Sequence, residues 1–251
     1  QSIENELTER VADQSKMQTS LHEAQARYQA YLQQSQAMFS AKLANEQAKQ
    51  QYQQLFQRFN DAKTNASNAM IDLETLSIPD NPTLLEEIIG TGTRIDDMLY
   101  TLTNTMGELI HTQSLEVIQS HQQDVSILLG NLTTNFTFLK QQTDGLDTLG
   151  LLQTFEQQYA IINTLLAAPA ELYKTQQAVV EAQLQAEQHY LDADKEFNAN
   201  NLALDKLITL ADRRFSSLQT IASNAIEQGQ TLAIVLALVF IVMVSFISFF
   251  T

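Results

Sequence analysis

Arg94 is the residue whose type and position are best suited to binding chemistry. It is the only basic residue between Lys63 and Lys140, and it ends the stretch GTGTR at residues 90–94. A guanidinium can hold a carboxylate through two parallel hydrogen bonds, and free backbone N–H groups favour anions. Two interpretations of the stretch stay open. Either it is a kink or π-bulge within a helix, or its backbone N–H groups and Arg94 receive an anion.

Three polar side chains follow Arg94 within one to three helical turns and could face the same groove. We therefore predict one ligand-binding set on this segment, made of Arg94, Tyr100, Thr101 and Asn104.

Catalytic and metal-binding patterns are not found in the sequence. The four histidines, His22, His111, His121 and His189, are scattered without HExxH spacing, and the chain has no cysteine. Nucleophile-elbow, P-loop and dinucleotide-binding motifs are also missing. We expect no catalytic residue, no metal and no cofactor, so this chain is not predicted to be an enzyme, although a longer parent protein could be a histidine kinase.

The C-terminal stretch predicts a membrane span. Residues 232–250 carry no charge, and two serines are their only polar residues. About 20 apolar residues of helix cross a bilayer core, so we assign residues 229–251 to a single transmembrane helix. Residues 1–228 form the predicted extracytoplasmic helical-bundle sensor domain.

Charges near the span predict its orientation. The nearest basic residues are Arg213 and Arg214, and Glu227 is the only charge between them and Leu232. Cytoplasmic flanks normally carry Lys and Arg, so the N-terminal part is expected in the periplasm of a bacterium and the span in its inner membrane. On this interpretation, we expect further sequence before Gln1 and after Thr251.

Composition favours an all-α fold. The 251 residues include 7 Gly and 3 Pro, which leaves room for very long helices. A net charge of −15 disfavours nucleic acid as a partner.

Apolar spacing predicts the order of the helices. A first helix should cover residues 2–76 and end at SIPDNPT, residues 77–83. Residues 84–142 are predicted to be two helices, or one helix bent near residues 111–114. A turn at residues 143–150 should precede a further helix, which Pro169 either kinks or divides in two.

These lengths predict long antiparallel helices that form stacked four-helix-bundle modules. The shorter helices can pack only on the membrane-distal halves, so partners for the proximal halves must come from missing sequence or a second subunit. A coiled-coil seam with heptad spacing is expected to carry motion toward the membrane. Its residues are Leu204, Ile208, Ala211, Phe215, Leu218, Ala222 and Ala225.

The layout resembles the helical bimodular sensor domain of TorS-type sensor histidine kinases and related bacterial chemoreceptors. The closest stretches begin IDDMLYTLTNTMGELIH at Ile95 and LLQTFEQQYAIINTLLAAP at Leu151. The likeness covers helix layout and apolar spacing over most of residues 17–188. It implies a two-component or chemoreceptor signalling protein that recognises a small organic ligand directly, or a ligand-loaded periplasmic binding protein.

The predicted function is therefore that of a receptor: a periplasmic sensor region, expected as a homodimer, that passes helix motion across the membrane. The alternative is a helical membrane-tethered or pore-forming structural protein. Ligand identity, kinase or chemoreceptor output, and oligomeric state stay open at this point.

Overall fold

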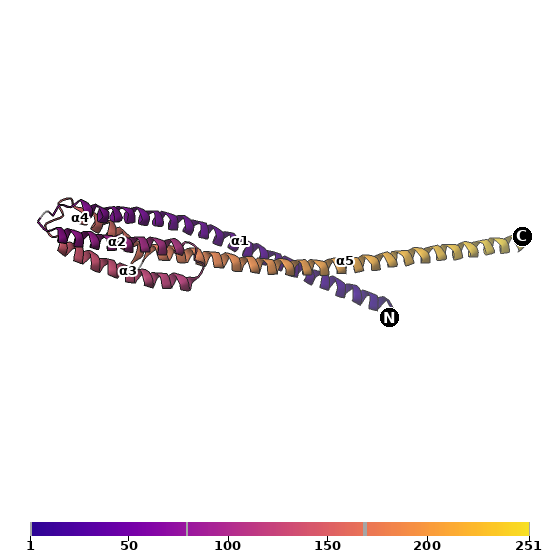
Figure 1. The fold of residues 1–251 in the computed structure, drawn as a ribbon. Coiled ribbons are helices and arrows are strands. Elements are labelled where there is room, and N and C mark those ends of the chain that lie inside the picture. The colour runs from indigo at the N-terminus through magenta and orange to yellow at the C-terminus, as the bar shows by residue number, and fades with distance from the viewer. Residues whose placement is uncertain (1, 79, 168–169, 251) are drawn as a thin grey trace. The chain divides into compact units, whose positions relative to one another are not determined.

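The computed structural model describes the backbone of residues 2–250, apart from positions 79 and 168–169, and the side chains of residues 11–239 with the same two gaps. Every regular element among the described residues is a helix, and they contain no β-strand, which confirms the predicted all-α class. Figure 1 labels the helices in chain order.

Proline and a polar cap separate the first long helix from the second. Helix α1 covers Ser2–Ile71 and continues into a 3₁₀ turn, η1, at Asp72–Thr75. Helix α2, Pro82–Leu109, has proline in its first turn, and its cap Asn81 accepts a hydrogen bond of 3.1 Å from the Leu84 amide. Both features are typical of a helix start, as the sequence predicted.

Capping also divides the following helices. Helix α3 is Leu115–Gln142, and its cap Ser114 accepts a hydrogen bond from the Val117 amide. The two-helix alternative for residues 84–142 is therefore the correct one. Helix α4, Leu151–Leu166, begins where the Asp147 carboxylate accepts hydrogen bonds of 3.0 and 2.9 Å from the Leu151 and Leu152 amides. That carboxylate satisfies free N–H groups and complements the positive helix end.

Helix α5 is a single helix over Glu171–Phe250. It begins after α4 has ended at Leu166, so two separate helices lie on either side of Pro169, which itself lies outside the described residues.

The chain divides into two compact units, each of which includes parts of α1 and α5. One unit is Gln36–His189, and the other combines Gln1–Ser35 with Tyr190–Thr251. The predicted boundary at residues 228/229 falls inside α5, which continues through it without a break.

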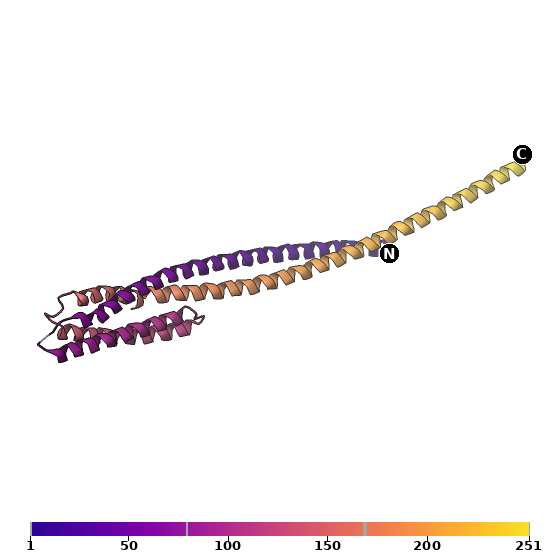
Figure 2. The same ribbon diagram turned by 45° about the horizontal axis from the view of Figure 1, so that its top comes forward.

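The unit Gln36–His189 contains the apolar core. Helices α2 and α3 lie side by side in both views (Figure 1 and Figure 2). The core joins α1, α2, α3, α4 and α5 through side chains that are almost fully buried. The largest of them are Phe59, Leu73, Ile88, Ile95, Leu99, Leu102, Met106, Leu109, Ile118, Leu132, Phe155 and Tyr173.

Buried polar side chains bond to main-chain oxygens across this core. The Tyr52 hydroxyl donates to the oxygen of Met106, 3.3 Å away in the last turn of α2, where carbonyls have no helical partner. Asn45 donates to the Val179 oxygen at 2.7 Å, and Gln176 to the Thr112 oxygen at 3.2 Å. Burial raises the pKa of Tyr52 well above its usual value, so the phenol stays protonated as a donor.

Gly92 permits the close approach of α2 to the end of α1. A Cβ at this position would lie 2.7 Å from Leu73 Cδ1 and 3.2 Å from the Met70 main-chain oxygen. Leu73 is fully buried and has little room to move. Gly90 lies two residues earlier on the same helix, and a Cβ added there would meet no atom within 4 Å.

The unit of residues 1–35 and 190–251 contains two helical segments of this chain, from α1 and α5. Arg27 donates to both carboxylate oxygens of Glu196, at 3.3 and 3.0 Å, and the rings of Tyr31 and Phe197 lie 5.7 Å apart. Its buried side chains are small, namely Ser20, Ala24, Ala193 and Ala203. Two segments alone leave most of their larger apolar side chains exposed, as the helix lengths predicted.

The predicted membrane span lies largely beyond the described side chains, which end at residue 239. Within the residues that were searched, no helix combines the length and the apolarity needed to cross a membrane. The stacking of two modules within this chain likewise stays a prediction.

The contrast between the two glycines gives a test of the packing. Gly92→Ala should lower the free energy of unfolding by about 1–3 kcal/mol, because the added methyl group overpacks a filled core. Gly90→Ala should raise it by roughly 0.5–1 kcal/mol, because alanine is the better helix former and meets nothing. Urea unfolding followed by circular dichroism measures both. Equal effects of the two substitutions would contradict the close approach at Gly92.

Candidate ligand-binding site

The predicted ligand-binding residues all lie on α2. Residues 90–94 are regular α-helix without a π-bulge, so their backbone N–H groups bond within the helix and are not free for an anion. Arg94, Tyr100, Thr101 and Asn104 lie at least partly open to solvent, and the cavities described below are lined by other residues. Whether they bind a ligand stays a prediction.

Arg94 contacts a buried hydroxyl on its own helix. Its Nη2 donates to Thr91 Oγ1 at 3.1 Å. Thr91 is fully buried, and the same hydroxyl lies 2.9 Å from the Glu87 main-chain oxygen and 3.1 Å from Gln142 Oε1 on α3. Thr91, which is not among the predicted site residues, therefore links α2 to α3.

The predicted α5 seam is largely exposed in this chain. Phe215 is 70% exposed and Ile208 is 58% exposed. None of the seven seam residues, Leu204, Ile208, Ala211, Phe215, Leu218, Ala222 and Ala225, is buried. Their heptad spacing is helical as predicted, but the described part of the chain buries none of them against a packing partner.

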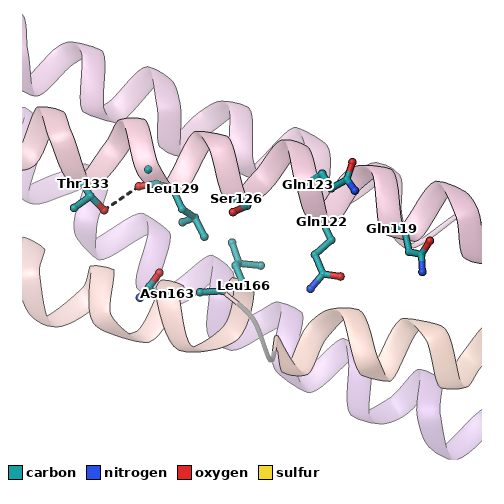
Figure 3. A pocket seen from close by; sticks show the side chains of 10 residues that line it. Gln119, Gln122, Gln123, Ser126, Leu129, Thr133, Asn163 and Leu166 are labelled. Atoms are coloured by element: carbon teal, nitrogen blue, oxygen red, sulfur yellow. Dashed lines mark hydrogen bonds between the residues drawn. The ribbon is translucent and has the colours of Figure 1, made fainter.

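A cavity of about 660 Å³ lies between α3 and the C-terminal end of α4. This volume is within the range of small-molecule sites, about 300–1,000 Å³. In Figure 3, Gln122 and Ser126 extend from α3 toward Asn163 and Leu166 of α4. The complete lining is Gln119, Gln122, Gln123, Ser126, Leu129, Gly130, Thr133, Asn163, Leu166 and Ala167.

No ionisable side chain lines this cavity. Its polar groups are four amides and two hydroxyls, which both donate and accept hydrogen bonds. The last carbonyls of α4 near Leu166 add acceptors and the negative end of a helix dipole. Such a lining favours an uncharged or cationic ligand rich in O–H or N–H groups, and disfavours an anion.

A hydroxyl pair joins the two helices at one end of the cavity. The hydroxyls of Thr133 and Tyr159 lie 2.8 Å apart, and each lies 2.9 Å from the Leu129 main-chain oxygen. Burial raises the pKa of Tyr159, while the hydrogen bond with Thr133 opposes this shift in part. The aromatic pair Phe136 and Phe155, with ring centroids 4.5 Å apart, packs α3 and α4 together.

Helix α3 also contacts the start of α5 beside the cavity-lining glutamines. The Tyr173 hydroxyl on α5 is 3.4 Å from the His121 main-chain oxygen and donates to it. Burial is the main cause that raises the pKa of Tyr173, followed by Tyr52 and Asp124. His121 Nδ1 is buried and has no hydrogen-bond partner among the described residues.

The residues of this cavity resemble an ordinary polar helix face, so no motif in the sequence marked them as a site. Residues 119, 123, 126, 130 and 133 follow steps of four and three, a signal that could have marked one polar stripe of α3. The sequence does not show which residues lie opposite this stripe, because Asn163 and Leu166 belong to another helix. Among the side chains that are described, no group of three or more His, Cys, Asp or Glu is placed to hold a metal ion.

Comparisons with known proteins gave no match: no protein-family model, no curated protein and no solved structure corresponds significantly to this chain. The resemblance to TorS-type sensors therefore stays a prediction from helix layout and apolar spacing.

The roles of Thr91 and Arg94 can be separated by stability. Thr91→Val should lower the free energy of unfolding by about 1–2 kcal/mol, because it leaves the half-buried Gln142 amide without this partner. Arg94→Ala should change it by no more than roughly 0.5 kcal/mol, because the side chain lies at the surface. Thermal or urea unfolding of both variants shows which substitution lowers the free energy of unfolding more. A larger loss for Arg94→Ala would show that the arginine is structural.

Proposed function

We propose that this chain is the extracytoplasmic sensing region of a bacterial transmembrane signal-transduction receptor, related in layout to TorS-type sensor kinases and chemoreceptors. The observation that carries the proposal is the place of the polar cavity. Its wall includes Leu166 and Ala167 at the end of α4, directly before α5. Helix α5 then continues without interruption to Phe250.

The proposed ligand is a small uncharged or cationic molecule with several hydroxyl or amino groups. Amides from α3 and Asn163 from α4 would bind it from both sides of the cavity. A ligand-loaded periplasmic binding protein that docks on the outer helices is the second form of the same function. In both forms, the ligand or the binding protein is recognised by the unit Gln36–His189.

Ligand binding would move α5 through contacts that already join it to the cavity. Leu172 and Tyr173, in its first turn, are buried in the core. Tyr173 donates to the His121 oxygen on α3, between Gln119 and Gln122. A ligand that changes the distance between α3 and the C-terminal end of α4 would therefore displace α5. Shifts of about 1–2 Å between packed helices are a known means of signalling.

The membrane part of the proposal rests on the uncharged residues 232–250. The N-terminal part would lie in the periplasm, and a cytoplasmic kinase or chemoreceptor region would receive the shift. A homodimer is proposed through the exposed seam from Leu204 to Ala225, because apolar heptad faces pair with one another.

Calorimetric titration of the chain in lipid nanodiscs tests whether the α3–α4 cavity binds a small ligand. Neutral polyols, sugars and amines should give direct binding heat. Asn163→Leu and Gln122→Leu should each weaken it roughly 3–10-fold, because each removes one hydrogen-bonding amide. Arg94→Ala is the matched control and should bind normally.

The outcomes of this titration separate the alternatives. Loss of binding with Arg94→Ala alone would move the site to the predicted residues of α2. Heat obtained only with a periplasmic protein fraction would indicate mediated sensing. No response to any of these would contradict the sensor proposal and favour a tether.

The membrane span can be tested with single cysteines, because the chain has none of its own. In sealed vesicles, Gln230→Cys should react with a thiol reagent that does not cross membranes, and Ser245→Cys should stay protected until detergent is added. The reason is that residue 245 would lie within the hydrocarbon core, about 30 Å thick. Equal labelling of both cysteines in intact vesicles would contradict a span.

A further inference from the structure

A groove lies between α1 and α5 in the unit of residues 1–35 and 190–251. Its volume is about 600 Å³, which is again typical of small-molecule sites. Two turns of α1 and three turns of α5 form it. The lining residues are Ser15, Lys16, Thr19, Ser20, Leu202, Asp205, Lys206, Thr209, Leu210 and Arg213.

Basic side chains outnumber acidic ones in this groove. Three cations, Lys16, Lys206 and Arg213, face one carboxylate, Asp205, in a chain whose net charge is −15. Within the described residues, Lys206 and Arg213 form no ion pair. Lys16 has only a 3.7 Å contact with Asp13, and its side chain is 66% exposed. A surface pair of this kind is weak, so positive charge is available to a ligand.

One hydroxyl in the groove, that of Ser20, has no protein partner among the described residues. Ser20 is 9% exposed, and its hydroxyl makes no hydrogen bond within the described part of the chain. The neighbouring hydroxyls differ, because Thr19 donates to the Ser15 oxygen and Thr209 to the Asp205 oxygen. The Ser20 oxygen is not among the buried unpaired polar atoms, so it still reaches solvent, and its O–H can donate a hydrogen bond to a ligand.

The remaining lining is apolar. Leu202 and Leu210 lie on α5 about two turns apart, and the aliphatic stems of the lysines and the threonine methyl groups extend this surface. Lys206 lies between these leucines along the helix, and Arg213 follows Leu210 by one turn. The groove therefore combines positive charge with apolar contact along one helix face.

We propose that this groove binds a small organic monocarboxylate with an apolar body. Lys206 and Arg213 attract the carboxylate, Ser20 donates a hydrogen bond to it, and Leu202 and Leu210 contact the apolar body. A single carboxylate suits the site better than a polyanion, because Asp205 repels additional negative charge. The site is separate from the uncharged α3–α4 cavity, and the inference does not depend on the receptor proposal.

The test is isothermal titration of the full chain in lipid nanodiscs with three probes at equal ionic strength: benzoate, benzamide and acetate. Benzoate should bind. Benzamide, which has the same body without the charge, and acetate, which has the charge without the body, should each bind at least about 10-fold more weakly.

Variants assign the binding to this groove. Lys206→Gln and Arg213→Gln should each weaken benzoate binding by about 10-fold or more, because each removes a charge-assisted contact. Arg214→Gln is the matched control: it removes the same charge from the next position, which does not line the groove, and should stay within about 2-fold of the unaltered chain. Lys206 and Arg213 are not buried, so these variants should keep their helical circular dichroism.

Three results would overturn the proposal. The first is the absence of benzoate binding up to about 20 mM. The second is equal binding of benzoate and benzamide, which would remove the role of charge. The third is an equal loss of benzoate affinity in Arg214→Gln and Arg213→Gln. That result would mean that the overall charge of α5 attracts the anion without a defined groove.

Discussion

Burial of one apolar core by helices of very different lengths is the constraint on which the fold depends. Helices α1 and α5 have 70 and 80 residues, whereas α2 and α3 have 28 each and α4 has 16. The main core cluster runs from Tyr52 to Val180, so only part of each long helix finds apolar partners on all sides. The rest of α1 and α5 forms a two-segment unit in which Phe215 and other large apolar side chains stay exposed. An exposed apolar face of this kind is a reason to expect a partner.

The polar groups of the core fix how its helices pack. Tyr52, Asn45 and Gln176 each donate a hydrogen bond to a main-chain oxygen of another segment. Each bond forms in only one axial register of the two segments, whereas apolar contacts alone would allow the helices to slide past one another. Gly92 acts in the same way through shape, because only the absence of a Cβ lets α2 approach Leu73 so closely. Packing and hydrogen bonding thus select the same arrangement.

The two concave sites differ in the ligand chemistry that they favour. The α3–α4 cavity has amides, hydroxyls and helix-end carbonyls without a charged side chain, whereas the α1–α5 groove has three cations beside leucines. Neither site contains the predicted Arg94. Helix α5 is connected to both: Tyr173 contacts α3 beside the cavity, and Lys206 and Arg213 line the groove. In a receptor, α5 would be the element that both ligands affect.

The sequence by itself determined the helical class, the breaks near residues 77–83 and 143–150, and the heptad spacing after Leu204, because proline, glycine and apolar periodicity act through local backbone geometry. It also determined the uncharged stretch at residues 232–250. Only the tertiary structure decided that residues 90–94 are plain helix beneath a close helix contact, and that Gln122 and Asn163 line one cavity. Sites of this kind join residues far apart in the chain, and their geometry depends on which helices pack together, which no local pattern specifies.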